Sequence, residues 1–157
     1  MVVRVRVGFT LVELLIVVVI LGILAAVVVP QFSDASEEAN NARVAEDLRN
    51  LRMAIARYTI DHDGRAPSIK ANGAADAVVN NFISRLTGRT DKSGAINASG
   101  AYGPYLSAFP SNPLTSPAAQ AANVKFGTGN PPSGVQGWYY NTSTYKISIN
   151  TSGYEGL

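Results

Sequence analysis

The sequence predicts an α+β protein in which a long N-terminal α-helix, transmembrane in its first half, packs on a small C-terminal antiparallel β-sheet. Three observations support this class: an uninterrupted apolar run near the N-terminus, a helical stripe of apolar residues beyond it, and three short strand-like segments near the C-terminus. The length of 157 residues suits a single domain of ordinary size.

The apolar run is long enough to cross a membrane. It covers the 21 residues from Phe9 to Val29 and contains a single charge, Glu13. As a helix that rises ~1.5 Å per residue it spans about 30 Å, the thickness of the hydrocarbon core of a bilayer. Basic residues precede the run, at Arg4 and Arg6, and acidic residues follow it, so we expect the N-terminus on the cytoplasmic side.

Two other kinds of N-terminal segment compete with this interpretation. A cleaved secretory signal peptide is disfavoured, because Val27-Val28-Val29-Pro30 stands where the small residues of a cleavage site would lie. A plain signal anchor stays open, since it needs only an apolar segment with basic residues before it.

Glu13 lacks a cationic neighbour in its own segment. No Lys, Arg or His occurs from Phe9 to Ala42. A carboxylate left unpaired in lipid costs about 3 kcal/mol on insertion scales, so we expect a compensating cation. That cation can come from Arg4 or Arg6, from another molecule, or from a new α-amino group made by cutting the chain near Phe9. Snorkelling or protonation at the membrane surface is the remaining alternative.

The residues around Glu13 form a motif. Gly8-Phe9-Thr10-Leu11-Val12-Glu13, followed by the apolar run, resembles the class III signal of type IV pilins and type II secretion pseudopilins. The resemblance implies that residues 1–8 are a basic leader and that a prepilin peptidase cuts between Gly8 and Phe9. It also implies N-methylation of the new Phe9 amine and a role for Glu13 in assembly.

A helix is expected to continue well beyond the apolar run. From Gln31 to Asp61 the sequence has no Gly or Pro, and apolar residues recur at steps of three and four. The stripe consists of Val44, Leu48, Leu51, Ile55 and Tyr58. Gly64 and Pro67 follow it, which predicts one helix from Phe9 to about His62.

Gly22 and Pro30 are the weak points of that helix. Pro30 lacks a backbone donor and Gly22 is a weak helix former. We expect a kink or a melted stretch between them in an assembled filament, whereas the isolated chain can keep a continuous helix. The alternative is a separate helix that begins at Pro30, just outside the bilayer.

A second, short helix is expected over residues 74–86. Its apolar face would consist of Ala75, Val78, Phe82 and Leu86, and Gly88 would follow its end. Beyond it, a Gly- and Asn-rich surface loop and a proline-rich turn segment are expected at residues 89–103 and 102–114.

Three short strands are expected near the C-terminus, at residues 124–126, 138–140 and 145–149. Residues 141–144 would connect the last two strands as a hairpin. In the last strand Tyr145, Ile147 and Ile149 alternate with polar residues, so this face should be buried on the helix.

This order of elements is similar to the pilin fold, and residues 61–67 and 103–113 look like those of the major pseudopilin of type II secretion. On this resemblance, residues 9–30 form the transmembrane and filament-core helix and residues 31–157 the globular domain. That domain is divided into a helix continuation at 31–62, a loop and short helix at 63–117, and the sheet at 118–157.

The resemblance also raises the question of calcium, because the subfamily typically ends in an acidic loop that binds it. Here residues 153–157 carry one acid and residues 127–137 carry none. From the residues themselves we expect no cofactor and no metal, and calcium is possible only on the resemblance.

No catalytic constellation is apparent. The chain has no Cys, no phosphate-binding loop and no Gly-x-Ser-x-Gly elbow. Asp61, His62 and Asp63 have the chemistry for a metal site or an acid–base pair, but their spacing suits neither, and we expect a solvated helix terminus. Seven aromatic residues are expected in the core rather than on a binding surface. They are Tyr102, Tyr105, Trp138, Tyr139, Tyr140, Tyr145 and Tyr154.

The sequence therefore predicts a non-enzymatic, membrane-anchored subunit of a type IV-like filament. The main interpretation is the major pseudopilin of a type II secretion system. A major or minor pilin of a type IV pilus is the alternative, and a monomeric, signal-anchored binding or enzyme domain is the alternative of a different class.

The resemblance also implies partners and a location. The partners are further copies in a helical homopolymer, a prepilin peptidase and N-methyltransferase, an inner-membrane assembly platform, minor pseudopilins and membrane lipid. The chain would cross the inner membrane once, with its C-terminal domain periplasmic or extracellular, and would be extracted into a filament. Nucleic acid is not an expected partner, because the net charge of +2 comes from Arg4 and Arg6 alone.

Overall fold

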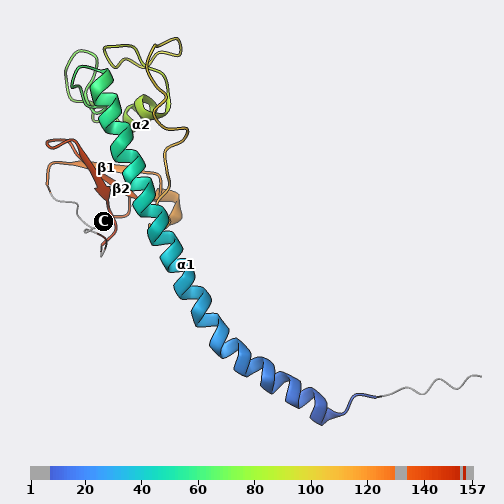
Figure 1. Ribbon diagram of the computed structural model, residues 1–157. Coiled ribbons are helices and arrows are strands. Elements are labelled where there is room, and N and C mark those ends of the chain that lie inside the picture. The colour runs from blue at the N-terminus through green and yellow to red at the C-terminus, as the bar shows by residue number, and fades with distance from the viewer. Residues whose placement is uncertain (1–7, 130–133, 153, 155–157) are drawn as a thin grey trace, which may run out of the picture. The chain divides into compact units, whose positions relative to one another are not determined.

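The computed structural model describes residues 8–129, 134–152 and 154 and contains two compact units, Met1–Ala39 and Asn40–Leu157 (Figure 1). Its composition of helices and a small sheet confirms the expected α+β class. The first seven residues of the expected leader, with Arg4 and Arg6, lie outside the described residues. The elements are α1 (Leu11–Asp61), α2 (Val79–Thr87), the 3-10 helix η1 (Ala118–Gln120), and strands β1 (Val124–Gly127), β2 (Trp138–Asn141) and β3 (Lys146–Ile149).

Helix α1 begins two residues after the expected start and ends one residue before the expected end. Gly22 and Pro30 both lie inside it, and the helix is unbroken across them. The alternative of a separate helix that begins at Pro30 is therefore wrong. Proline removes one backbone donor and crowds the carbonyl four residues before it, which weakens a helix locally while the neighbouring residues keep their own donors. The break expected in an assembled filament concerns a different state of the protein and stays a prediction.

The second half of α1 forms one wall of the core, within the second unit. The expected stripe on this helix is confirmed, because all five of its residues are buried. The sheet and α2 provide the other walls. The residues that pack with the stripe are Ala54, Phe82, Leu86, Val124, Trp138, Tyr140, Ile147 and Ile149.

The sheet is mixed rather than antiparallel, which corrects the sequence-based expectation. Its strand order is β1-β2-β3, with β2 and β3 antiparallel as expected but β1 and β2 parallel. Ten residues, 128–137, separate β1 from β2. That connection is too long for a tight hairpin turn, and it lets the chain return to the end of the sheet at which β1 begins.

Strand β3 starts one residue later than expected, at Lys146. Ile147 and Ile149 are buried as expected, but Tyr145 is 45% exposed and has a φ of 57°, in the left-handed region. Tyr145 therefore belongs to the connection after β2 and not to the inward face of β3. Among the other aromatic residues, Trp138, Tyr139 and Tyr140 are buried as expected, and three tyrosines, Tyr102, Tyr105 and Tyr154, are half-buried.

Helix α2 is shorter than expected, because the residues before it form an extended bridge and a turn. Ile69 pairs with Ala75 in an isolated β-bridge, and the Asp76 side chain accepts a hydrogen bond from the Val78 amide at 3.2 Å. Phe82 and Leu86 are buried as expected, whereas Ala75 and Val78 are exposed. The local hydrogen bonds of an Asp side chain thus compete successfully with the start of the helix.

A buried ion pair joins α2 to the loops on either side of it. Arg85 Nη2 lies 2.9 Å from Asp76 Oδ2, and both side chains are at most 6% exposed. Arg85 also donates to the carbonyl oxygens of Pro67 at 2.9 Å and Gly94 at 3.0 Å. Asn81 donates to the same Asp76 oxygen at 3.1 Å. The guanidinium therefore connects α2 to the loop segments at Pro67, Asp76 and Gly94.

Candidate functional site

The N-terminal motif lies at the start of α1. Gly8, Phe9 and Thr10 precede the helix, are exposed and have no regular secondary structure. Phe9 is 79% exposed. The peptide bond expected to be cut, between Gly8 and Phe9, is thus in an accessible, non-helical segment next to the apolar helix.

Thr10 and Glu13 form a capping box. The Thr10 amide and hydroxyl both donate to Glu13 Oε2, at 2.9 Å and 2.7 Å, and the Glu13 amide donates back to Thr10 Oγ1 at 3.2 Å. Reciprocal bonds of this kind satisfy backbone donors that a helix start leaves unpaired. Glu13 therefore has a hydrogen-bonding partner in its own chain, and it forms no ion pair with any of the described residues. Its second oxygen, Oε1, takes part in none of these three bonds.

The first part of α1 exposes a continuous apolar surface. The large apolar residues from Leu11 to Val28 are between 42% and 82% exposed. Over the same residues the mean hydropathy is 3.2, and among the described helices this is the one long and apolar enough to cross a membrane. Gly22 adds no side chain, and apart from its chain neighbours and the backbone of its own helix no described atom lies within 4 Å of the place where a Cβ would be. Such a surface needs lipid or another protein to cover it.

Comparisons with known proteins identify the family. The prokaryotic N-terminal methylation motif matches residues 8–29. The type II secretion system core protein G of Aeromonas hydrophila is 31% identical over 120 residues, which are 76% of each chain. The chain belongs to the core protein G family. This result confirms the expected pseudopilin relationship, including its region beyond the N-terminal helix.

Other relatives of the family match over shorter stretches. Core protein G of Pectobacterium carotovorum is 41% identical over 61 residues, 39% of this chain and 38% of the relative. The type IV narrow pilus major component PilA5 of Thermus thermophilus is 47% identical over 57 residues, 36% of this chain and 49% of the relative. The chain therefore matches less than half of the length of these two relatives. No solved structure is significantly similar to the chain.

The structure brings together the two segments that carried the resemblance to the major pseudopilin. Tyr105, from residues 103–113, donates its hydroxyl to Asp61 Oδ2 at 3.0 Å. Burial, together with the Asp61 carboxylate beside it, raises the pKa of Tyr105 well above its ordinary value. The loop therefore closes over the C-terminal end of α1.

The expectation of a solvated terminus at Asp61-His62-Asp63 is wrong for His62. This residue is fully buried, and its ring stacks on Tyr58 with 3.9 Å between the centroids. Nδ1 donates to the Tyr58 carbonyl at 2.7 Å, since a carbonyl can only accept, and Nε2 lies 2.9 Å from Thr90 Oγ1. Asp63 is exposed as expected, 2.8 Å from Lys92. His62 is thus a hydrogen-bonded core residue.

The described residues do not fit an acidic calcium site of the kind that the family implies. Between Asp91 and Glu155 the sequence has no carboxylate, and Glu155 lies outside the described residues. Calcium takes six to eight oxygen ligands, of which carboxylates supply the charge. Among residues 8–129, 134–152 and 154, no three His, Cys, Asp or Glu side chains are close enough to share a metal ion.

Amide side chains hold the C-terminal region together instead. The buried Asn112 donates to the Gly137 carbonyl at 2.9 Å, and the buried Asn150 donates to the Gln136 carbonyl at 3.1 Å. The backbone of Asn150 adds two further bonds: its N–H donates to the Gly137 carbonyl, and its carbonyl accepts from the Gly134 N–H. These bonds connect the proline-rich segment to the residues before and after the β2–β3 hairpin.

Proposed function

We propose that this protein is a structural, non-enzymatic subunit of a helical filament and acts as the major pseudopilin of a type II secretion system. The observation that supports this most directly is the exposed apolar helix, Leu11–Val28, which follows the methylation motif on a domain with its own core. The relationship to core protein G extends this support beyond the motif.

The apolar helix can be covered in two ways, and assembly exchanges one for the other. In the inner membrane, lipid tails cover the residues from Leu11 to Val28. In a filament, the same surface packs against the helices of neighbouring copies. Lipid tails are as apolar as Val, Ile and Leu, so moving the helix from lipid into a filament changes the hydrophobic free energy very little. Assembly therefore depends on close packing and on specific polar contacts.

We propose that Glu13 makes the polar contact that favours packing between copies. Cleavage after Gly8 removes Arg4 and Arg6 and creates a positive amine on Phe9. Glu13 Oε1, which takes no part in the capping box, can accept a hydrogen bond from the Phe9 amine of an adjacent copy. Thr10 keeps its bonds to Oε2 at the same time. An intermolecular pair satisfies both ions and sets the height of each incoming subunit.

The first test is cleavage of the bond between Gly8 and Phe9. N-terminal sequencing of the protein from cells that contain the processing machinery should begin at Phe9. Gly8→Val should leave an uncut precursor, because a branched side chain at the scissile bond hinders access of the peptidase. As a control, Val7→Ala leaves that bond unchanged and should be cut normally. Wild-type protein that retains Met1 would favour the signal-anchored alternative.

A surface type IV pilus is the second candidate, and the similarity to PilA5 in the N-terminal region favours it. Both kinds of filament use the same kind of helix, so the N-terminal region does not separate them. Deletion of the gene separates them: loss of protein secretion with intact surface pili supports the pseudopilus, and the converse supports the pilus.

The helix between Gly22 and Pro30 is expected to lose regular hydrogen bonding when the filament forms. Pro30 has no backbone N–H to donate and Gly22 is a weak helix former. This stretch of α1 therefore requires the least free energy to change from helix to extended backbone. A filament reconstruction by electron microscopy should show non-helical backbone at Ala25, Ala26 and Val27. Unbroken helix there would contradict this prediction without affecting the family assignment.

The globular domain is expected to fold without calcium. A site filled at 100 times its Kd would stabilise the domain by about 2.7 kcal/mol, which corresponds to a Tm increase of roughly 10 °C for a domain of this size. We expect no such increase between excess EDTA and millimolar calcium. Asn112→Ala should lower the Tm under both conditions, since it removes the side-chain donor to the Gly137 carbonyl and the acceptor of the Leu114 amide. A calcium-dependent Tm would contradict this expectation.

A further inference from the structure

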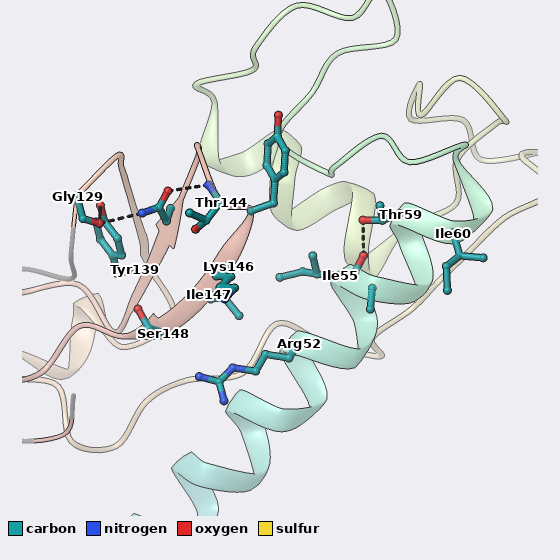
Figure 2. Close-up of a pocket in the computed structure, with 13 residues that line it drawn as sticks. Arg52, Ile55, Thr59, Ile60, Gly129, Tyr139, Thr144, Lys146, Ile147 and Ser148 are labelled. Atoms are coloured by element: carbon teal, nitrogen blue, oxygen red, sulfur yellow. Dashed lines mark hydrogen bonds between the residues drawn. The ribbon is translucent and has the colours of Figure 1, made fainter. Parts of the chain in front are cut away.

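A groove lies between the C-terminal half of α1 and the β2–β3 hairpin, within the second unit (Figure 2). Its volume is about 880 Å³. Ile55 and Ile147, both buried, face each other across its base, and Ile60 and Tyr145 line it with 78% and 45% of their surface exposed. It is therefore an apolar depression with exposed apolar walls, which the described residues leave open.

The described residues that line this groove include positive charges. Arg52 and Lys146 line it from α1 and from β3, and the described lining residues include no Asp or Glu. A partner that fits the groove should therefore combine an apolar side chain with carboxylates.

The same chain carries such a segment. Residues 9–39 contain four carboxylates and no Lys or Arg, whereas residues 40–157 contain eleven Lys and Arg against seven carboxylates. Three of the four carboxylates lie at positions 34–38. Phe32, which precedes all three, is 73% exposed, and Glu37 and Glu38 are exposed and form no ion pair in the described part of the chain. The described residues of this segment thus present two exposed carboxylates, Glu37 and Glu38, and one exposed aromatic ring, Phe32.

We propose that the segment 32–39 of one copy docks in the groove of a second copy. Phe32, Ala35 and Ala39 share one face of the helix and would lie against the apolar walls, and Glu38, at the edge of that face, would face Lys146. This proposal rests on the proposed function, because it requires copies assembled side by side in a filament. The acidic segment of one chain would then attract the more basic globular domain of its neighbour. This attraction would add to the contact at Glu13.

Disulfide cross-linking tests the contact directly, because the natural chain has no Cys. The test variant carries Ala35→Cys and Thr144→Cys, two exposed positions of which the second lines the groove. Mild oxidation of its filaments should give a ladder of covalent multimers. The matched control carries Ala35→Cys and Asn50→Cys, since Asn50 is exposed on α1 but does not line the groove, and it should give no ladder.

A charge exchange gives a second, independent result. Glu38→Lys should lower the yield of filaments about tenfold, because like charges then meet at the groove. Adding Lys146→Glu in the same chain should restore most of the yield. Adding Lys70→Glu instead should not, since Lys70 is an exposed lysine away from the groove. Circular dichroism of each variant checks that the domain is folded.

The outcomes separate this proposal from the proposed function. Wild-type protein that forms no filaments contradicts the proposed function itself. Wild-type filaments without a ladder in the test variant overturn the docking proposal. A disulfide confined to one chain, a covalent bond to a different protein, or rescue by Lys70→Glu as strong as that by Lys146→Glu also overturns it.

Discussion

Glu13→Gln should abolish filament assembly while membrane insertion and cleavage continue. Glutamine retains the capping box, because its side-chain oxygen can accept the bonds from Thr10 that Glu13 accepts now. It removes only the negative charge. The variant therefore distinguishes the charge of Glu13 from its hydrogen bonds, and we expect at least a tenfold loss of filaments, since the Phe9 amine would be left unpaired in an apolar environment.

Two further variants define the role of this carboxylate. Thr10→Ala removes the cap but keeps the charge, and should cost the helix about 1 kcal/mol with only a partial loss of assembly. Glu13→Asp keeps the charge but shortens the reach, and should also be partly defective. Sheared filaments, quantified by electrophoresis against the cleaved protein in the membrane, provide the measurement. Wild-type yield from cleaved Glu13→Gln would mean that Glu13 acts as a helix cap or in recognition by the peptidase.

Asp76→Ala should destabilise the globular domain by about 3–5 kcal/mol, since it leaves the buried Arg85 guanidinium without its counter-ion. This is a large part of the 5–15 kcal/mol typical of a whole domain. Urea unfolding of the full chain in detergent, followed by the fluorescence of the buried Trp138, measures it. The matched control is Arg43→Ala, whose side chain is 61% exposed and lies 3.7 Å from Asp47, and which should cost less than about 1 kcal/mol.

The same pair predicts a pH dependence. Burial raises the pKa of Asp76, but the hydrogen bonds from Asn81 and Arg85 outweigh it and leave the pKa below the ordinary value of 3.8. A carboxyl whose pKa is lower in the folded state contributes stability that is complete above the unfolded pKa. That contribution is lost as the pH falls through the folded pKa. Below about pH 4 the wild type should therefore lose stability faster than Asp76→Ala. An equal loss of stability in the wild type and in Asp76→Ala would contradict the lowered pKa of Asp76 as the cause.

The N-terminal part of the protein was predictable because its signals are local. The apolar run and the stripe from Val44 to Tyr58 need only the period of a helix, and both are confirmed. The capping box was overlooked, although its signal, a Thr followed three residues later by a Glu before an apolar run, is present in the sequence. A search for caps as well as for periods would have found it.

The remaining differences have causes that a local pattern does not contain. The parallel pairing of β1 with β2 depends on the path of a ten-residue connection. His62 is buried because Tyr102 and Tyr105, some 40 residues later, return to cover it. Arginine is a residue type that usually lies at the surface. Arg85 is buried because the folded loops surround its guanidinium with hydrogen-bond acceptors. In each case contacts between distant segments override the local preference.

A reconstruction of the assembled filament by electron microscopy, at a resolution that shows side chains, tests most directly whether this chain assembles through Glu13. We predict that the Glu13 carboxylate lies within about 4 Å of the Phe9 amine of a neighbouring subunit, the distance of an ion pair. Phe9 should be the first residue of every subunit. A filament in which Glu13 faces no amine of another copy, or in which residues 1–8 are still attached, would contradict this mechanism of assembly.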